Sequence, residues 1–103
     1  MYTVRMKELR FDWDSKKDKA NQKKHGVTFD EARSVFFDEN ALQFYDPDHS
    51  DTEDRFILLG TNHKLNTLVV CHCCREEDTV IRIISARKAD ADEKQTYWSF
   101  RKW

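Results

Sequence analysis

Alternation of apolar and polar residues predicts several short strands, and the strongest apolar run lies at residues 79–86. Its valine and isoleucines are β-branched, which favours a strand. Apolar side chains occur at both odd and even positions, so we expect a central strand that is covered on both faces. Arg82 lies in the middle of this run and Arg87 follows it. A half-buried arginine keeps its charge and therefore needs a carboxylate, a phosphate or a route to water.

The same reasoning predicts four further strands and three helices. Asp14, Thr28 and Asp90 are typical N-terminal caps of helices. The elements follow the order β-α-α-β-β-β-β-α, with strands at 7–13, 41–45, 55–60, 67–73 and 79–86 and helices at 14–24, from 28 onward and at 91–102. This order predicts an α+β fold with a small, mostly antiparallel sheet, two helices in the N-terminal part and one C-terminal helix. We expect aromatic residues of the last helix to cover one face of the sheet.

Length and composition indicate a single globular domain over residues 1–103. Hydrophobic residues make up 39% and charged residues 36%, and the 13% of aromatic residues supply surface for a core. No apolar run approaches the roughly 18 residues of a membrane span, and the N-terminal residues have no cleavage signature, so we expect a cytoplasmic protein that does not enter a membrane. The three cysteines, at positions 71, 73 and 74, are an odd and clustered set, which is a poor disulfide framework and fits a reducing compartment.

Two segments contain metal-ligand residue types, but neither has the spacing of a known site. The cluster Cys71-His72-Cys73-Cys74 lacks the second ligand pair of a structural zinc site, and small buried thiols in a sheet are the simpler interpretation. The acidic loop 46–54 has Asp51 where an EF-hand needs glycine, and Ile57 stands where it needs glutamate. We therefore expect no metal and no cofactor.

The formal net charge of −1 argues against a surface that is positive throughout, although the charges are segregated along the chain. Lys16, Lys19 and Lys23 share one face of the first predicted helix. Such a face is either a solvated surface or a patch that tracks phosphates. His25, at the end of this helix, is either a cap near the last carbonyls or a proton-transfer residue.

Three arginines are the strongest candidates for chemistry. Arg55, Arg82 and Arg87 lie in or beside neighbouring predicted strands and could converge, either in an ion-pair network or in a phosphodiester site. Glu53, just before one of these strands, could reach an arginine on a neighbouring strand. Arg82 and Arg87 differ by five positions, so a regular strand would point them to opposite faces. They can share a site only if the strand ends or bulges between them.

At these residues the chain resembles the BrnT toxins of bacterial type II toxin–antitoxin systems. The resemblance extends from Phe11 to Tyr97 and rests on separated matches in a fixed order: Phe11-Asp12-Trp13-Asp14, Asn21-x-x-Lys24-His25-Gly26-Val27-x-Phe29-x-Glu31-Ala32, Asp46-x-x-His49-Ser50-Asp51-x-Glu53-x-Arg55, Gly60, and Ile81-Arg82-Ile83-Ile84-Ser85-Ala86-Arg87-Lys88-Ala89. It implies a RelE-like ribonuclease fold and a metal-independent endoribonuclease that cleaves RNA by 2′-hydroxyl attack and arrests translation and growth.

The resemblance also implies site residues and partners. Arg55, Arg82 and Arg87 would hold the phosphate, and Glu53 would orient an arginine or move a proton. Further substrate contacts are expected from Lys24, His25 and Tyr97, the last by stacking on a base or donating a proton. The partners would be RNA, either free or as ribosome-associated mRNA, and a BrnA-like ribbon-helix-helix antitoxin, with DNA bound only through that antitoxin. The alternative is a weakly active or inactive toxin-fold partner of the antitoxin that acts in operon autorepression, which the low net charge favours.

Overall fold

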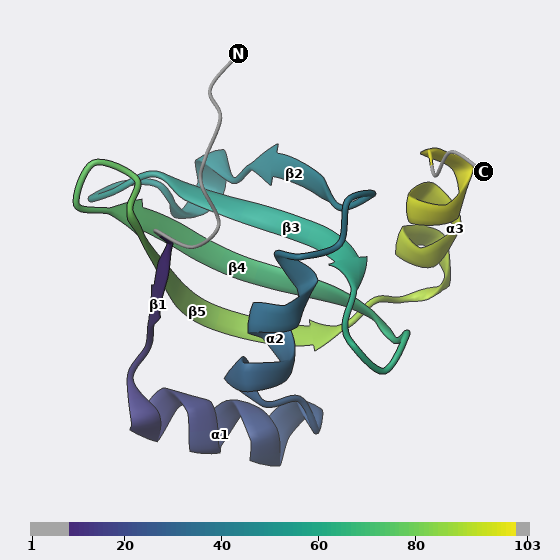
Figure 1. Cartoon of the computed structure of the whole chain (residues 1–103), viewed down its shortest axis with the longest axis horizontal. Helices are drawn as coiled ribbons and strands as arrows, with labels where there is room; N and C mark the ends of the chain where they lie inside the picture. Colours follow the sequence, from purple (N-terminus) through teal and green to yellow (C-terminus); the bar gives the residue numbers. More distant parts are fainter. Residues whose placement is uncertain (1–8, 101–103) are drawn as a thin grey trace.

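A computed structural model describes residues 9–100, which form one five-stranded sheet with three α-helices (Figure 1). The strands lie side by side in the order β1-β5-β4-β3-β2. The elements, in chain order, are β1 (Arg10–Asp12), α1 (Ser15–His25), α2 (Phe29–Val35), β2 (Leu42–Tyr45), the short 3-10 helix η2 (Pro47–His49), β3 (Arg55–Thr61), β4 (Thr67–Arg75), β5 (Val80–Lys88) and α3 (Ala91–Phe100). The strand predicted at 7–13 is observed at Arg10–Asp12, and residues 7 and 8 lie outside the described range.

The sheet is mixed, which corrects the expectation of a mostly antiparallel sheet. Strands β2 to β5 pair in antiparallel fashion, but β1 runs parallel to β5, with Arg10 opposite Val80 and Asp12 opposite Arg82. Consecutive strands joined by tight turns must be antiparallel. β1 and β5 are distant in sequence, so no turn dictates their relative direction, and the hydrophobic pattern alone could not reveal it.

The first two helices begin at the residues that the sequence indicates, and α1 ends at His25, one residue beyond the predicted end. The Asp14 carboxylate accepts hydrogen bonds from the backbone of Lys16 and Lys17, and Gly26 ends α1 in the left-handed conformation, with φ of 70°. In α2 the Thr28 hydroxyl accepts a hydrogen bond from the Glu31 amide at 3.1 Å. Both helices pack against the sheet: α1 along β5, and α2 across β3, β4 and β5.

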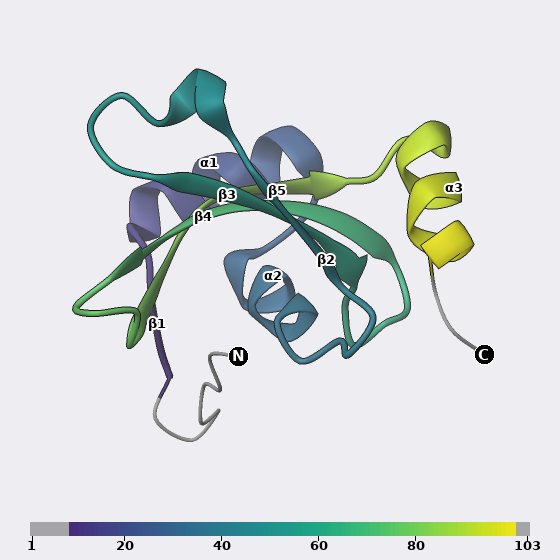
Figure 2. The same ribbon diagram turned by 90° about the horizontal axis from the view of Figure 1, so that it is seen from above.

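The main core lies between α2 and one face of the sheet. Its fully buried residues come from the α1–α2 connection, α2 and the three central strands: Val27, Phe29, Ala32, Val35, Leu58, Leu68, Val70, Ile81, Ile83 and Ala86. The opposite face is not covered by α2; the loop that contains η2 rises over it instead, and α1 lies alongside β5 (Figure 2). This second face of the sheet, called the open face below, is therefore accessible to a ligand.

A β-bulge in β5 decides which side chains reach the open face. Ser85 pairs with Cys71 and Ile83 pairs with the next residue of β4, so Ile84 is an extra residue in the ladder. The extra residue changes the parity of the strand, which is why Ile83 and Ala86 both lie in the main core. Arg82 and Arg87, on either side of the bulge, consequently project from the same face.

The position of α3 differs from the prediction that its aromatic residues cover a face of the sheet. Figure 1 shows α3 standing beyond the end of β5, next to the end of β3. Tyr97 is fully buried, in a small second cluster with Leu59, Val69 and Ala89. Phe100 is 67% exposed, and residues 101 and 102 of the predicted helix lie outside the described range. No helix within residues 9–100 is both long enough and apolar enough to cross a membrane.

Candidate functional site

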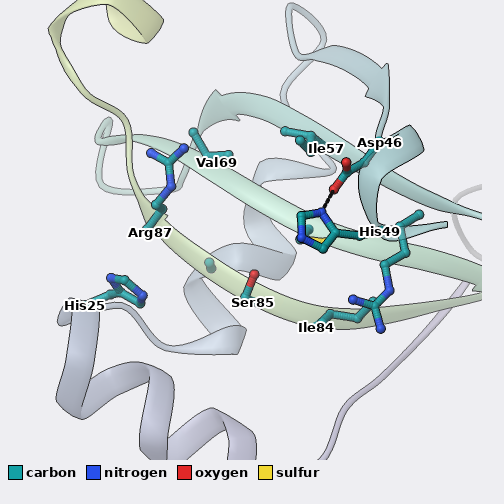
Figure 3. A pocket seen from close by; sticks show the side chains of 11 residues that line it. His25, Asp46, His49, Ile57, Val69, Ile84, Ser85 and Arg87 are labelled. Carbon is teal, nitrogen blue, oxygen red and sulfur yellow. Dashed lines mark hydrogen bonds and ion pairs between the residues drawn. The ribbon is translucent and has the colours of Figure 1, made fainter. Parts of the chain in front are cut away.

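A cleft of about 300 Å³ lies on the open face of the sheet (Figure 3). Strands β3, β4 and β5 form its floor, the end of α1 forms one side, and the loop with η2 forms another. The lining residues are His25, Asp46, His49, Arg55, Ile57, Val69, Cys71, Ile84, Ser85, Ala86 and Arg87. The cleft thus combines two arginines, two histidines and one carboxylate around an apolar floor.

Arg55 is the cleft arginine that remains available to a ligand. Within residues 9–100 its guanidinium forms no ion pair, whereas Arg75, Arg82 and Arg87 each pair with a carboxylate. Its backbone is held firmly, because its amide donates a hydrogen bond to the Ser50 hydroxyl at 3.0 Å. A half-buried guanidinium without a carboxylate partner is suited to binding an anion.

Arg82 lies on the same face, in a row of residues that crosses four strands. Arg55 pairs with Cys73, Cys73 pairs with Arg82, and Arg82 pairs with Asp12. Residues that oppose one another in neighbouring strands share a face. The two arginines therefore flank a buried cysteine, at roughly 10 Å between backbones given the usual strand spacing. Arg82 does not line the cleft; it donates a hydrogen bond to Asp12 at 2.6 Å.

Arg87 enters the cleft from the far side of the bulge and is held by α3. Its two terminal nitrogens donate to the two oxygens of Glu93 at 2.8 and 2.9 Å. This bidentate pair is the main reason why the pKa of Glu93 lies below its ordinary value. The same carboxylate closes a capping box with Asp90, since each residue's amide donates to the other's side chain. One glutamate thus starts α3 and fixes the orientation of Arg87.

Glu53 does reach an arginine on a neighbouring strand, as predicted, but that arginine is Arg75. The Arg75 guanidinium donates to the Glu53 carboxylate at 3.1 Å. This hydrogen bond is the largest cause of a lowered pKa at Glu53, with smaller contributions from Cys73 and the charge of Arg55. Glu53 does not line the cleft.

Two histidines face the cleft from different elements. His25 projects from the end of α1, and His49 projects from η2 on the other side (Figure 3). The Nδ1 atom of His49 lies 2.9 Å from an oxygen of Asp46. Since a carboxylate only accepts hydrogen bonds, Nδ1 carries the proton and Nε2 is left as an acceptor when the ring is neutral. The exposed Lys24, beside His25, does not line the cleft.

Tyr97 has a structural position. Its ring is fully buried, and its hydroxyl donates to Asp38 at 2.6 Å. A ring in this position cannot stack on a substrate base, so Tyr97 is left out of the site proposed below.

Two cysteines of the open face, Cys71 in the cleft and Cys73 beside it, are poorly suited to act as nucleophiles. Burial raises the pKa of Cys71 and of Cys73 above the ordinary value of a thiol. A thiol with a raised pKa has little of the reactive thiolate at neutral pH. Cys71 therefore contributes shape to the floor of the cleft.

No site role was predicted for Asp46, His49, Ser85 or Arg75, although the first three stand in segments that resemble the family. The spacing of Asp46 and His49 within one acidic turn was the available signal, because residues three apart in a helical turn are neighbours. No comparable signal exists for Arg75, whose position on the open face depends on the register of β4.

The fold and the cleft define a small α+β protein with an arginine- and histidine-lined site on one face of a sheet, which is suited to a phosphodiester ligand. Residues 13–93 match the family described as ribonuclease toxin, BrnT, of type II toxin–antitoxin systems. The chain therefore belongs to the BrnT family of ribonuclease toxins, and a type II system implies an antitoxin partner.

A solved structure supports the fold. The crystal structure of the Brucella abortus ribonuclease toxin BrnT is similar to this chain, with a TM-score of 0.61 and 23% sequence identity over 80% of this chain and 97% of that one. At this level of identity the likeness concerns the fold alone. No curated protein sequence gives a significant match.

Proposed function

We propose that this toxin cleaves RNA without a metal ion, by attack of a 2′-hydroxyl on the neighbouring phosphate. The observation that carries the proposal is Arg55, a guanidinium without an ion pair within residues 9–100, in a cleft that also holds two imidazoles. The cleft has a single carboxylate, Asp46, which His49 already engages. Magnesium sites favour free carboxylates and water, so this set of side chains is better matched to proton transfer by imidazole.

In this proposal each group of the cleft has a role. His49, oriented by Asp46, takes the proton of the 2′-hydroxyl through Nε2, and the freed oxygen forms a bond to phosphorus. The bond from phosphorus to the 5′-oxygen breaks, and His25 donates a proton to that leaving oxygen. The products are a 2′,3′-cyclic phosphate and a 5′-hydroxyl. Arg55 and Arg87 stabilise the extra negative charge on the phosphate during this step.

The remaining predicted residues have supporting roles in this proposal. Arg82 lies in the same cross-strand row as Arg55, two strands away, and extends the positive face along the RNA backbone, as Lys24 does from α1. Glu53 holds Arg75 in place and does not transfer a proton. Cleavage of messenger RNA would arrest translation and growth, and a ribbon-helix-helix antitoxin would neutralise the toxin and carry the complex to DNA.

Purified protein incubated with RNA in excess chelator tests the proposal. We expect cleavage to ends that carry 2′,3′-cyclic phosphate, and a loss of roughly 100-fold or more in rate for Arg55→Ala, as for other transition-state donors. Arg33→Ala is the matched control, because Arg33 is an exposed arginine of α2 that pairs only with Asp30 among the described residues. Dependence on added metal would refute the mechanism.

In cells, Arg82→Ala should yield folded protein that no longer arrests growth. Full toxicity of this variant at normal expression would remove Arg82 from the substrate-binding face.

A second candidate function is a toxin-fold partner that binds its antitoxin and has little activity. The net charge of −1 and the carboxylate partners of Arg75, Arg82 and Arg87 favour it, since paired arginines attract RNA weakly. Absence of cleavage in the chelator assay, even with ribosomes present, would support this candidate.

A further inference from the structure

A second hollow opens beside the cleft on the same face and has no role in the steps above. It has a volume of about 240 Å³ and is lined mainly by apolar side chains: Phe44, Ile57, Leu59, Val69, Glu93 and Thr96. Ile57 and Val69 also line the cleft, and Figure 3 shows both at its side. The two hollows therefore share a wall. We call the second one the side groove.

Phe44 gives the side groove an exposed aromatic wall. It lies on β2, at the edge of the sheet, directly opposite Ile57 of β3. The residue is 46% exposed. Its neighbour Tyr45 has a protein partner, since the ring packs edge-on against Phe56 with centroids 5.8 Å apart. For Phe44 no such ring contact occurs within residues 9–100, and because nearly half of the residue is exposed, part of its side chain is accessible to a ligand.

We propose that the side groove receives a nucleobase of the RNA, adjacent to the phosphate in the cleft. This inference rests on the proposed ribonuclease function. Because the groove shares Ile57 and Val69 with the cleft, a group that enters it lies within one nucleotide of the bound phosphate. A base has flat, apolar faces and a polar edge, which match an apolar groove with an aromatic wall and a polar rim. Stacking of bases on aromatic side chains is a common mode of single-strand recognition.

The polar rim indicates which bases the groove favours. Glu93 accepts hydrogen bonds from Arg87 on both oxygens and from the Asp90 amide on Oε1. A carboxylate offers about four acceptor positions, so Oε2 keeps one for a further donor. Exocyclic amino groups of bases are such donors, as in the pairing of glutamate with the amino group of cytosine. Adenine, cytosine and guanine carry this group and uracil does not, so uracil should be the least favoured base.

Phe44→Ala combined with an abasic substrate tests the inference. After the cleavage site is mapped, the base on each side of the cleaved bond is removed in turn, leaving its ribose and 2′-hydroxyl. We expect Phe44→Ala to lower kcat/KM roughly tenfold on intact RNA, within the range for loss of one stacked base. One of the two abasic substrates lacks the base that occupies the side groove. On that substrate Phe44→Ala should cleave as fast as the unmodified protein, because the contact with Phe44 is already lost. Phe37→Ala is the matched control, because Phe37 is an exposed phenylalanine that lines neither hollow.

A binding measurement separates the groove from catalysis. RNA with 2′-O-methyl groups cannot be cleaved by 2′-hydroxyl attack, so its affinity for the toxin, measured by fluorescence anisotropy, reports binding alone. Phe44→Ala should weaken this affinity roughly tenfold, and Phe37→Ala should leave it unchanged. If the unmodified toxin binds RNA but never cleaves it, the proposed catalysis fails and the groove is still judged by this affinity.

Equal cleavage and equal affinity for Phe44→Ala and the unmodified protein would overturn the proposal. The same holds if the substitution weakens only the binding of a protein partner such as the antitoxin, which would make the groove a protein-docking surface. Cleavage beside uracil as fast as beside the amino-bearing bases would overturn the role given to Glu93.

Discussion

Acid should destabilise this protein through His72, well above the pH at which its carboxylates titrate. The His72 ring is 1% exposed, packs against Phe36 and Phe56, and its Nδ1 has no hydrogen-bond partner among the described residues. Burial lowers the pKa of His72 from 6.5 to about 4, only partly offset by a hydrogen bond with the Val70 backbone. In the unfolded chain the ring is solvated and takes up a proton at its ordinary pKa.

The sign and size of the effect follow from this difference in proton affinity. Between pH 6.5 and about 4 the unfolded state binds more protons than the folded state. The free energy of unfolding therefore has its full value above this range and decreases as the pH falls through it. At about 1.4 kcal/mol for each tenfold change in affinity, the full loss approaches about 3 kcal/mol. Between pH 7.5 and 5.5 the loss is about 1 kcal/mol.

Carboxylates with lowered pKa values affect the stability of the protein only at lower pH. Hydrogen bonds lower the pKa of Glu53 and Glu93 from 4.5, and this stabilisation is lost only as the pH falls below about 4.5. Urea unfolding at pH 7.5 and 5.5 therefore isolates the histidines. We expect the midpoint to fall by roughly 0.5–1 M for the unmodified protein.

Two substitutions test whether the fall in the urea midpoint comes from the His72 ring. His72→Phe should abolish the difference between the two pH values, whatever its effect on stability at pH 7.5, because phenylalanine cannot be protonated. His63→Phe, at an exposed histidine, should retain it. An undiminished pH difference in His72→Phe would show that the reasoning about His72 is wrong.

Three further predictions concern packing and hydrogen bonds. Gly60→Ala should cost about 1–3 kcal/mol in urea unfolding, because a Cβ there would lie 2.9 Å from an Asp38 oxygen and 3.0 Å from Val35. Asn21→Ala should cost about 3 kcal/mol, since its buried amide bonds Val27 O and both backbone groups of Ala86; a cost below 1 kcal/mol would contradict this. Tyr97→Phe should lose about 1 kcal/mol of stability and leave RNA cleavage unchanged, so a specific loss of cleavage would return Tyr97 to the site.

Much of the fold was predictable because short stretches of sequence specify where its helices and strands begin and end. Caps at Asp14 and Thr28, the left-handed Gly26 and the polar link between β3 and β4 each follow from the preferences of a few adjacent residues. The site was less predictable, because its members come from separate elements. Arg55, Arg87 and His25 were identified as candidates and do meet in the cleft. Lys24 and Glu53 lie outside it, and their catalytic or binding roles stay predictions.

The sequence by itself determined the elements, the family and the set of charged groups. Only the tertiary structure decided which of these groups meet. Residue counting placed Arg82 and Arg87 on opposite faces, and the single extra residue at Ile84 brought them to the same one. The register of the strands also places Arg75 where it pairs with Glu53. Arg55 therefore has no ion pair among the described residues. Local preferences act on neighbours along the chain, whereas a bulge and a register are set by how whole strands fit together.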